Sequence, residues 1–155
     1  MKLLVQRVTR ASVRFDGDLV SEIQAGYLVL IGVAATDTRK EADSLADRLL
    51  NLRIMADGAG KMNRSIMDSA GPDSAGHDSA GQILIVSQFT LCGDTKNGRR
   101  PGFAGAAPPE LARELYEYFA GKIRASGLVT CLGIFQAHME VELVNDGPVT
   151  FLLES

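Results

Sequence analysis

Residues 26–52, GYLVLIGVAATDTRKEADSLADRLLNL, decide the fold because the hydrophobic period changes within them. Tyr27–Val33 is a nearly continuous apolar run, which predicts a strand covered on both faces. Thr38 and Glu41 have the spacing of a capping box, and apolar residues then recur at helical intervals. The stretch therefore predicts a buried strand followed by a helix from Arg39 to Leu52.

Further elements flank this unit on both sides. Pro108-Pro109-Glu110 begins a second predicted helix, since proline suits the first helical turn, and Gly127 ends it. Segments with β character predict the remaining strands: Leu3–Val8, Ser12–Phe15, Leu19–Ile23, Gln82–Gln88, Val129–Phe135, His138–Val144 and Val149–Leu153. We expect a single domain over residues 1–155, of mixed α and β class. It has about eight mostly antiparallel strands, in a layered sheet or barrel-like arrangement, with two packed helices.

Residues 68–81 repeat Asp-Ser-Ala-Gly three times and show no periodic apolar face. We interpret them as a low-complexity loop inserted between two strands, because a solenoid unit needs about 20 residues or more. His77 lies in this loop and is not expected to be catalytic. His138 falls on the polar side of an alternating segment, which favours a surface residue over a ligand or base.

The composition narrows the function classes. A net charge of -3 is not the overall footprint of a nucleic-acid binder, so any RNA contact needs a local basic patch. Two cysteines provide neither a disulfide framework nor a four-cysteine zinc site. The chain shows no signal-peptide pattern and no apolar stretch of about 18 residues. We therefore expect a cytoplasmic protein that does not bind membranes.

The polar segment Ser87-Gln88-Phe89-Thr90 ends an apolar strand and is one candidate site. Its backbone N–H groups are suited to an oxyanion hole, and Thr90 to a nucleophile or a hydrogen-bond partner. Alternatively, the hydroxyl groups simply satisfy the backbone at the strand end. Cys92 adjoins the segment, as a half-buried thiol or a reactive one. No hydrolase elbow, phosphate loop or histidine pair with metal-ligand spacing occurs in the sequence.

Two other segments also allow two interpretations. Asn145–Thr150 is rich in turn formers and favours a turn between the last two strands. The alternative is a rigid loop at Gly147-Pro148 that presents main-chain oxygens to a ligand. The basic residues Lys96, Arg99 and Arg100 form either a solvated loop or a patch that contacts phosphates, and the pattern favours neither.

Several segments taken in order resemble the D-aminoacyl-tRNA deacylase family almost from end to end. Any one of them is weakly specific, whereas the ordered set is specific. The segments are Gln6-Arg7-Val8, Gly58–Asn63, Ser87–Leu91, Gly98–Pro101, Ala106–Glu110 and Leu143–Thr150.

The resemblance implies an activity and an assembly. The family hydrolyses the ester that joins a D-amino acid to the 3′-terminal adenosine of tRNA, as a homodimer without metal or organic cofactor. Residues matching its active-site motif are Ser87, Gln88, Phe89 and Thr90. Gly147 and Pro148 match a Gly-cis-Pro pair that reaches into the partner's pocket, and Arg7 matches the arginine that holds this loop. The basic residues of the patch would contact tRNA.

The resemblance also implies a mechanism. A rigid backbone wall would reject every L side chain and would let glycyl-tRNA through. The ribose 2′-OH would drive catalysis, while backbone N–H groups near Phe89 and Thr90 stabilise the oxyanion. Thr90 as a covalent nucleophile ranks second.

Three alternatives remain open at this point. A relative that edits L-alanine on threonine tRNA would carry proline in place of Ser87. A non-catalytic tRNA-binding module would need the basic patch but not Thr90 or Pro148, and a purely structural dimer would need none of them. The sequence also departs from the family pattern at Cys92, Gly93, Gln136 and His138, and in the long loop at residues 68–81.

Overall fold

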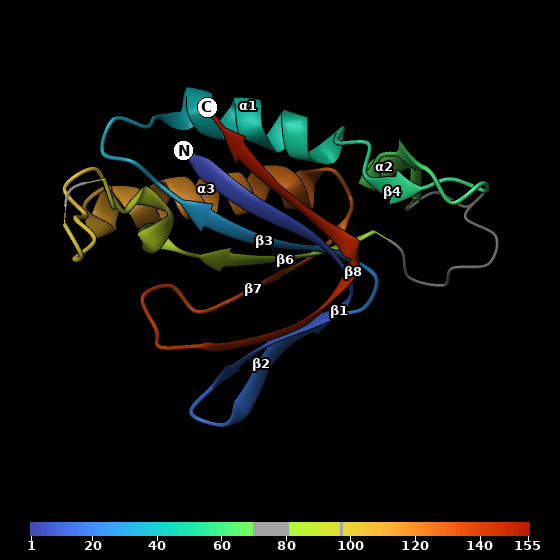
Figure 1. Ribbon diagram of the computed structural model, residues 1–155, viewed down its shortest axis with the longest axis horizontal. Helices are drawn as coiled ribbons and strands as arrows, with labels where there is room; N and C mark the ends of the chain where they lie inside the picture. The colour runs from blue at the N-terminus through green and yellow to red at the C-terminus, as the bar shows by residue number, and fades with distance from the viewer. Residues whose placement is uncertain (70–80, 97) are drawn as a thin grey trace.

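The computed structural model describes residues 1–69, 81–96 and 98–155 (Figure 1). The elements follow in the order β1 (Lys2–Phe15), β2 (Asp18–Ile23), β3 (Gly26–Gly32), α1 (Arg39–Leu50), β4 (Met55–Ala56), β5 (Met62–Arg64), α2 (Ile66–Ser69), β6 (Gln82–Ser87), the 3-10 helix η1 (Phe89–Cys92), α3 (Pro109–Ala125), β7 (Val129–Leu132) and β8 (Glu140–Glu154). Most of the predicted loop at residues 68–81 lies outside the described residues, and so does His77.

The strand β1 is the centre of the main sheet. It pairs antiparallel with β2, β3 and β8, while β3 and β7 each pair parallel with β6. The Ser21 hydroxyl donates a hydrogen bond of 2.9 Å to the Leu132 carbonyl, which joins β2 to β7 and brings the sheet close to closure. The predicted mixed fold with a barrel-like sheet is confirmed.

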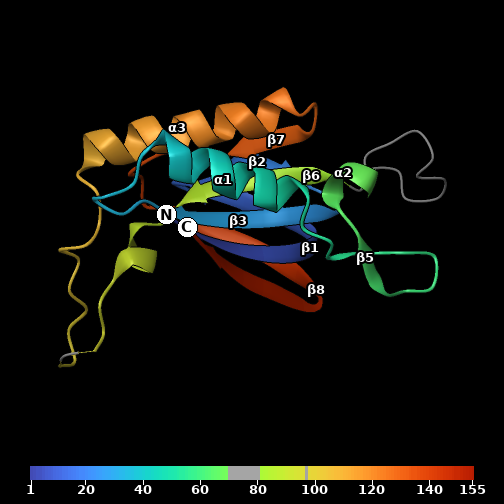
Figure 2. The ribbon, with the colours of Figure 1, turned by 90° about the horizontal axis from the view of Figure 1, so that it is seen from above.

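The helices α1 and α3 lie side by side over one face of the sheet (Figure 2). Along β3, Val29 and Ile31 face the helices, whereas Leu28 belongs to a second cluster on the opposite face. Burial on both faces explains the nearly continuous apolar run predicted for this strand. The described residues also include the short helix α2, which the sequence analysis did not predict.

The capping box of α1 forms as predicted. The Thr38 hydroxyl accepts a hydrogen bond from the Lys40 N–H, and the Glu41 carboxylate accepts one from the Thr38 N–H. The Thr38 hydroxyl also donates to the Glu41 carboxylate at 2.6 Å, and this bond, followed by the one from the Thr38 N–H, lowers the pKa of Glu41. The helix ends at Leu50 rather than Leu52, because the Asn51 side chain caps the Asp47 carbonyl at 2.9 Å.

Two predicted breaks between strands are wrong. The segments Leu3–Val8 and Ser12–Phe15 belong to one strand, β1. The expected turn at Asn145–Thr150 does not reverse the chain, since both parts of β8 run antiparallel to β1. Gln6 lies opposite Thr150 and Val8 opposite Asn145, so the four residues 146–149 stand opposite Arg7 alone. The turn-forming residues therefore make an enlarged β-bulge within one strand.

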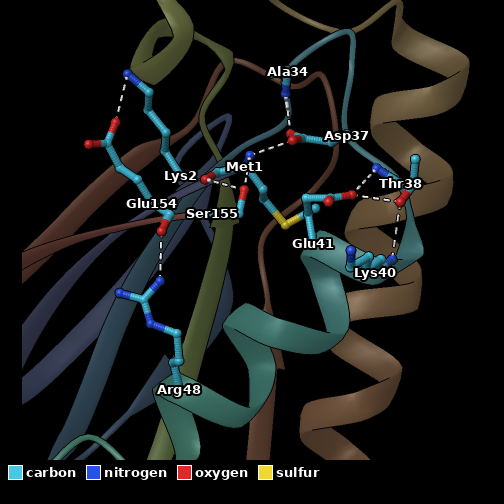
Figure 3. A network of polar contacts seen from close by, with 10 residues as sticks. All are labelled: Met1, Lys2, Ala34, Asp37, Thr38, Lys40, Glu41, Arg48, Glu154 and Ser155. Atoms are coloured by element: carbon cyan, nitrogen blue, oxygen red, sulfur yellow. Dashed lines mark hydrogen bonds and ion pairs between the residues drawn. The ribbon is translucent and has the colours of Figure 1, made fainter.

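A buried ion pair joins the two ends of the chain to the loop before α1 (Figure 3). The Met1 ammonium donates to the Asp37 carboxylate at 2.5 Å and to the Ser155 hydroxyl at 2.7 Å. The other Asp37 oxygen accepts a hydrogen bond from the Ala34 N–H at 2.6 Å. The two charged groups are 0% and 5% exposed, so neither is screened by water.

We expect D37N to destabilise the fold by about 3–5 kcal/mol, because it leaves the buried ammonium of Met1 without a counter-charge. Urea unfolding measures the change. The matched control is E154Q, which removes the neighbouring but exposed ion pair between Lys2 and Glu154 and should change stability by less than about 1 kcal/mol. Equal stability of the two variants would show that the buried pair contributes no more than the exposed one.

Candidate active site

A cavity of about 550 Å³ opens where the parallel strands β3 and β6 end. Ligands commonly bind at the carboxyl ends of parallel strands. The walls are mostly apolar, with a few polar groups. They are formed by Ile31, Val33, Val86, Ser87, Gln88, Phe89, Ala106, Ala107, Pro109, Ala112, Tyr116, Phe135, Gln136, Ala137, His138, Met139 and Val141.

Three residues of the predicted motif, Ser87, Gln88 and Phe89, line this cavity, whereas the fourth, Thr90, follows Phe89 in η1 and is not part of the lining. Ser87 pairs with Ile31 at the end of β6, and the Gln88 N–H donates to the Ile31 carbonyl at 2.8 Å. The chain then turns into η1, where the first N–H groups of a helix have no partner within the helix. The N–H groups of Phe89 and Thr90 have no acceptor among the described residues. Two unused donors therefore stand beside the cavity.

The amide of Gln88 fixes the Thr90 side chain. Its Nε2 atom donates to the Thr90 Oγ1 atom at 2.5 Å. The Thr90 hydroxyl therefore has its oxygen engaged and its proton available to a ligand. This favours a functional interpretation of the motif over the alternative in which the Thr90 hydroxyl bonds the backbone at the strand end.

Gly32 allows the motif to lie directly against the end of β3. A Cβ atom at this position would lie 2.8 Å from the Leu91 Cβ atom and 3.0 Å from the Gln88 carbonyl oxygen. The sequence analysis missed this residue. Its only signal is a glycine inside an apolar strand, which is typical of a close backbone approach.

Tyr116 and Phe135 form an aromatic wall that the sequence analysis also missed. Their ring centres lie 5.7 Å apart, and the Arg113 guanidinium stands 4.7 Å from the centre of the Phe135 ring. The Tyr116 hydroxyl donates to the Ile85 carbonyl at 3.0 Å. Burial raises the pKa of Tyr116 to about 12, so this phenol stays neutral near pH 7 and is not a general base.

His138 is exposed, as predicted, but it precedes β8 and also lines the cavity. Cys92 is half-buried, and burial raises the pKa of its thiol. A raised pKa disfavours the reactive thiolate, so Cys92 fits the interpretation as an unreactive thiol.

The bulge around Gly147 and Pro148 is held from both sides. The Asn145 amide donates to the Arg7 carbonyl at 2.8 Å and to the Val149 carbonyl at 3.0 Å, which closes the base of the bulge.

Arg7 forms the second support of the bulge. Its Nη1 atom donates to the Ile54 carbonyl at 2.6 Å. Its Nε atom lies 2.8 Å from the Asp146 carboxylate, as an ion pair without hydrogen-bond alignment. The structure thus brings Arg7 together with this loop, as expected.

The bulge lies apart from the cavity. The peptide bond between Gly147 and Pro148 is cis, and both residues are exposed. No residue from 144 to 149 lines the cavity. The structure therefore does not bring Gly147 and Pro148 together with Ser87–Thr90 inside one subunit.

The basic loop (residues 94–96 and 98–102) follows η1 directly. Asp94 and Gly102 exchange backbone hydrogen bonds of 2.7 and 2.8 Å, which close its base. Its cationic side chains are exposed and form no ion pair within the described part of the chain: Lys96, Arg99 and Arg100. Their contact with tRNA stays a prediction.

Comparisons with known proteins give the family of the chain. The sequence profile of the family described as D-Tyr-tRNA(Tyr) deacylase matches residues 4–154. A D-aminoacyl-tRNA deacylase from Geotalea uraniireducens is 52% identical over 155 residues, covering 100% of this chain and 94% of the relative. A protein of the same name from Symbiobacterium thermophilum is 50% identical, covering 100% and 96%.

Two solved structures resemble the fold. One, titled c-Myc DNA Unwinding Element Binding Protein, superposes with a TM-score of 0.88 at 41% identity, covering 100% of this chain and 99% of that one. A probable eukaryotic D-amino acid tRNA deacylase superposes with a TM-score of 0.81 at 15% identity, covering 98% and 97%, and supports the fold alone. Within residues 1–69, 81–96 and 98–155, no helix is long and apolar enough to cross a membrane.

We expect G32A to destabilise the protein by about 1–3 kcal/mol, because the new methyl group must displace Leu91 and the Gln88 carbonyl. Urea unfolding measures this change. The control is G121A in α3, where an added Cβ meets nothing within 4 Å and should stabilise the helix by about 0.5–1 kcal/mol. If both variants gained stability, the close approach at Gly32 would be wrong.

Proposed function

Because the chain belongs to the D-Tyr-tRNA(Tyr) deacylase family, we infer that its reaction takes place in the cavity beside Ser87–Thr90. The reaction is hydrolysis of the ester bond of D-aminoacyl-tRNA, which releases the D-amino acid and tRNA as a proofreading step in translation. We place it in the cytoplasm, where translation supplies the substrate. The observation that carries the site assignment is a pair of unused N–H groups, one on Phe89, which lines the cavity, and one on Thr90, the next residue.

These two N–H groups suit an oxyanion hole. When water attacks the acyl carbon of the ester, the carbonyl oxygen gains negative charge, and fixed donors stabilise it. The bond to the 3′ oxygen then breaks, and that oxygen takes a proton. Gln88 supports the arrangement by holding the Thr90 hydroxyl, whose proton is free to point at the substrate.

Thr90 acts here as a hydrogen-bond partner rather than as a covalent nucleophile. A nucleophilic hydroxyl needs an adjacent base to take its proton. The bond to Thr90 Oγ1 comes from an amide, which is no base, and no carboxylate or imidazole bonds to it within the described residues. This supports the ribose 2′-OH of the substrate as the group that assists proton transfer.

The working enzyme is a homodimer in which each cavity receives the Gly147-Pro148 bulge of its partner. The bulge is exposed and anchored by Arg7 and Asn145, yet none of its residues lines the cavity of its own subunit. An exposed loop that is anchored at its base and does not reach the cavity of its own subunit suits the role of a wall that a second copy supplies.

This wall selects by backbone rather than by side chain. Main-chain oxygens of Gly147 and Pro148 hold the α-amino group of the substrate and occupy the space that an L side chain would need. A D side chain points elsewhere, so its identity matters little. Glycine has no side chain to reject, and glycyl-tRNA is therefore also a substrate. The basic loop holds the tRNA phosphates.

Purified protein should hydrolyse D-tyrosyl-tRNA and glycyl-tRNA and leave L-tyrosyl-tRNA intact. T90A should lower kcat for the D-ester by about tenfold, because it removes the hydroxyl that bonds the substrate but keeps the backbone N–H group of the oxyanion hole. The measurement is release of labelled amino acid from each ester. If all three esters decayed as in buffer, the tRNA-binding module would replace the enzyme as the leading interpretation.

A mixing experiment tests whether the site is shared between subunits. One protomer carries T90A and the other carries G147A. The Cβ atom added at residue 147 would lie 2.5 Å from the Val149 Cγ2 atom, and the backbone φ of 129° at this position is unfavourable for any residue with a side chain. Each variant alone should be impaired. A mixed dimer restores one cavity with an intact motif and an intact bulge, so D-selective activity should return to about half per mixed dimer.

The outcome separates two geometries. If the bulge served the cavity of its own subunit, the mixed dimer would contain no intact site and activity would not return. Successive affinity purification through two different tags, one on each protomer, isolates the mixed dimers.

A further inference from the structure

Two aromatic rings lie exposed together at the edge of the cavity. Phe89 is 58% exposed and Phe103 is 39% exposed. Their ring centres lie 5.0 Å apart at an interplanar angle of 62°, an edge-to-face contact. Phe89 lines the cavity and Phe103 does not, so Phe103 is the outer ring of the pair.

The backbone around Phe103 keeps its ring in place. A Cβ atom at Gly93 would lie 3.1 Å from the Phe103 Cε1 atom, which shows that the ring rests against the glycine backbone. The Phe103 carbonyl accepts a hydrogen bond from the Ala106 N–H at 3.0 Å, and Ala107 is bonded to Val33 at the end of β3. The ring is thus tied to the same frame that holds the cavity.

The charge next to this ring is positive. Phe103 follows Gly102, the residue that closes the basic loop with Asp94. Asp94 is the single carboxylate between residues 93 and 107, against three cations in the same stretch. One of its oxygens accepts a hydrogen bond from the Lys96 N–H at 2.9 Å.

We propose that Phe103 is a stacking surface for the nucleobase that precedes the terminal adenosine of the bound tRNA. The proposal rests on the proposed function, since the terminal adenosine must carry its ester into the cavity. Proteins recognise single-stranded RNA by stacking unpaired bases on aromatic rings while cations hold the phosphates. Phe103 supplies the ring, and the basic loop supplies the cations. Because Phe103 lies outside the cavity that takes the ester, the base on it belongs to the preceding nucleotide.

The test compares two substrates. D-tyrosyl-tRNA has the preceding nucleotide, whereas D-tyrosyl-adenosine, esterified at the 3′ position, lacks it. F103L should lower kcat/KM for D-tyrosyl-tRNA about tenfold through a higher KM, because base stacking is lost. It should change the value for D-tyrosyl-adenosine by less than about twofold. F103W keeps an aromatic ring and should retain most of the activity on tRNA.

The matched control is V129A, because Val129 is 56% exposed and pairs with Gln82 at the start of β6, whereas the cavity lies where β6 ends. It should leave both substrates unaffected. If F103L lost activity equally on both substrates relative to the wild-type protein, the proposal would be overturned. Phe103 would then have a structural role or would contact the terminal adenosine. An unchanged KM for tRNA in F103L would also overturn it.

The result also separates this proposal from the proposed function. If the wild-type protein hydrolysed neither substrate, the function itself would fail. If it hydrolysed both and F103L behaved as wild type, only the stacking surface would be wrong.

Discussion

The close parallel pairing of β3 with β6 is the constraint on which the rest of the structure depends. It starts at Gly26, where a Cβ atom would lie 1.9 Å from the Gln82 carbonyl oxygen, so no larger residue fits. From there the register runs without a shift to Ile31 opposite Ser87. The Gln88 N–H extends the pairing by one more bond, and Gly32 lets η1 fold back over the strand end. The position of the two unused N–H groups follows from this register.

The same sheet also holds the Gly147-Pro148 bulge, the second half of the proposed site, on a different strand from the motif. β1 pairs with β3 along one edge and with β8 along the other, so it separates the motif from the bulge by a fixed number of strands. Arg7 lies on β1 at the point where the bulge departs. Its half-buried guanidinium ties the bulge to the Ile54 carbonyl as well as to Asp146. The chain thus carries the motif and the bulge on separate strands, and this separation supports the proposal that two subunits complete the site.

Local signals in the sequence predicted those elements whose cause is local. The capping box at Thr38 and the proline pair Pro108-Pro109 predicted the first residues of α1 and α3 to within one residue. The bulge was predicted wrongly because Asn, Asp, Gly and Pro form turns and bulges alike, and only pairing with distant β1 decides between them. Gly32 and Tyr116 owe their places in the site to contacts across the fold, which no spacing in the chain reveals. The roles of Ser87–Thr90 came from the family resemblance, and the pattern alone left them open.

Main-chain groups carry most of the proposed chemistry, and this has a consequence for the cavity walls. In the proposed site, the oxyanion donors are backbone N–H groups of η1, and the chiral wall consists of backbone oxygens of the bulge. Side chains such as Tyr116 and Phe135 only shape the space, and the phenol of Tyr116 stays neutral because burial raises its pKa to about 12. Gln136 and His138, which depart from the family pattern, belong to these walls. Neither contributes a backbone group to the motif or the bulge, so in the proposed mechanism these two residues affect the shape of the cavity and not the groups that act on the ester.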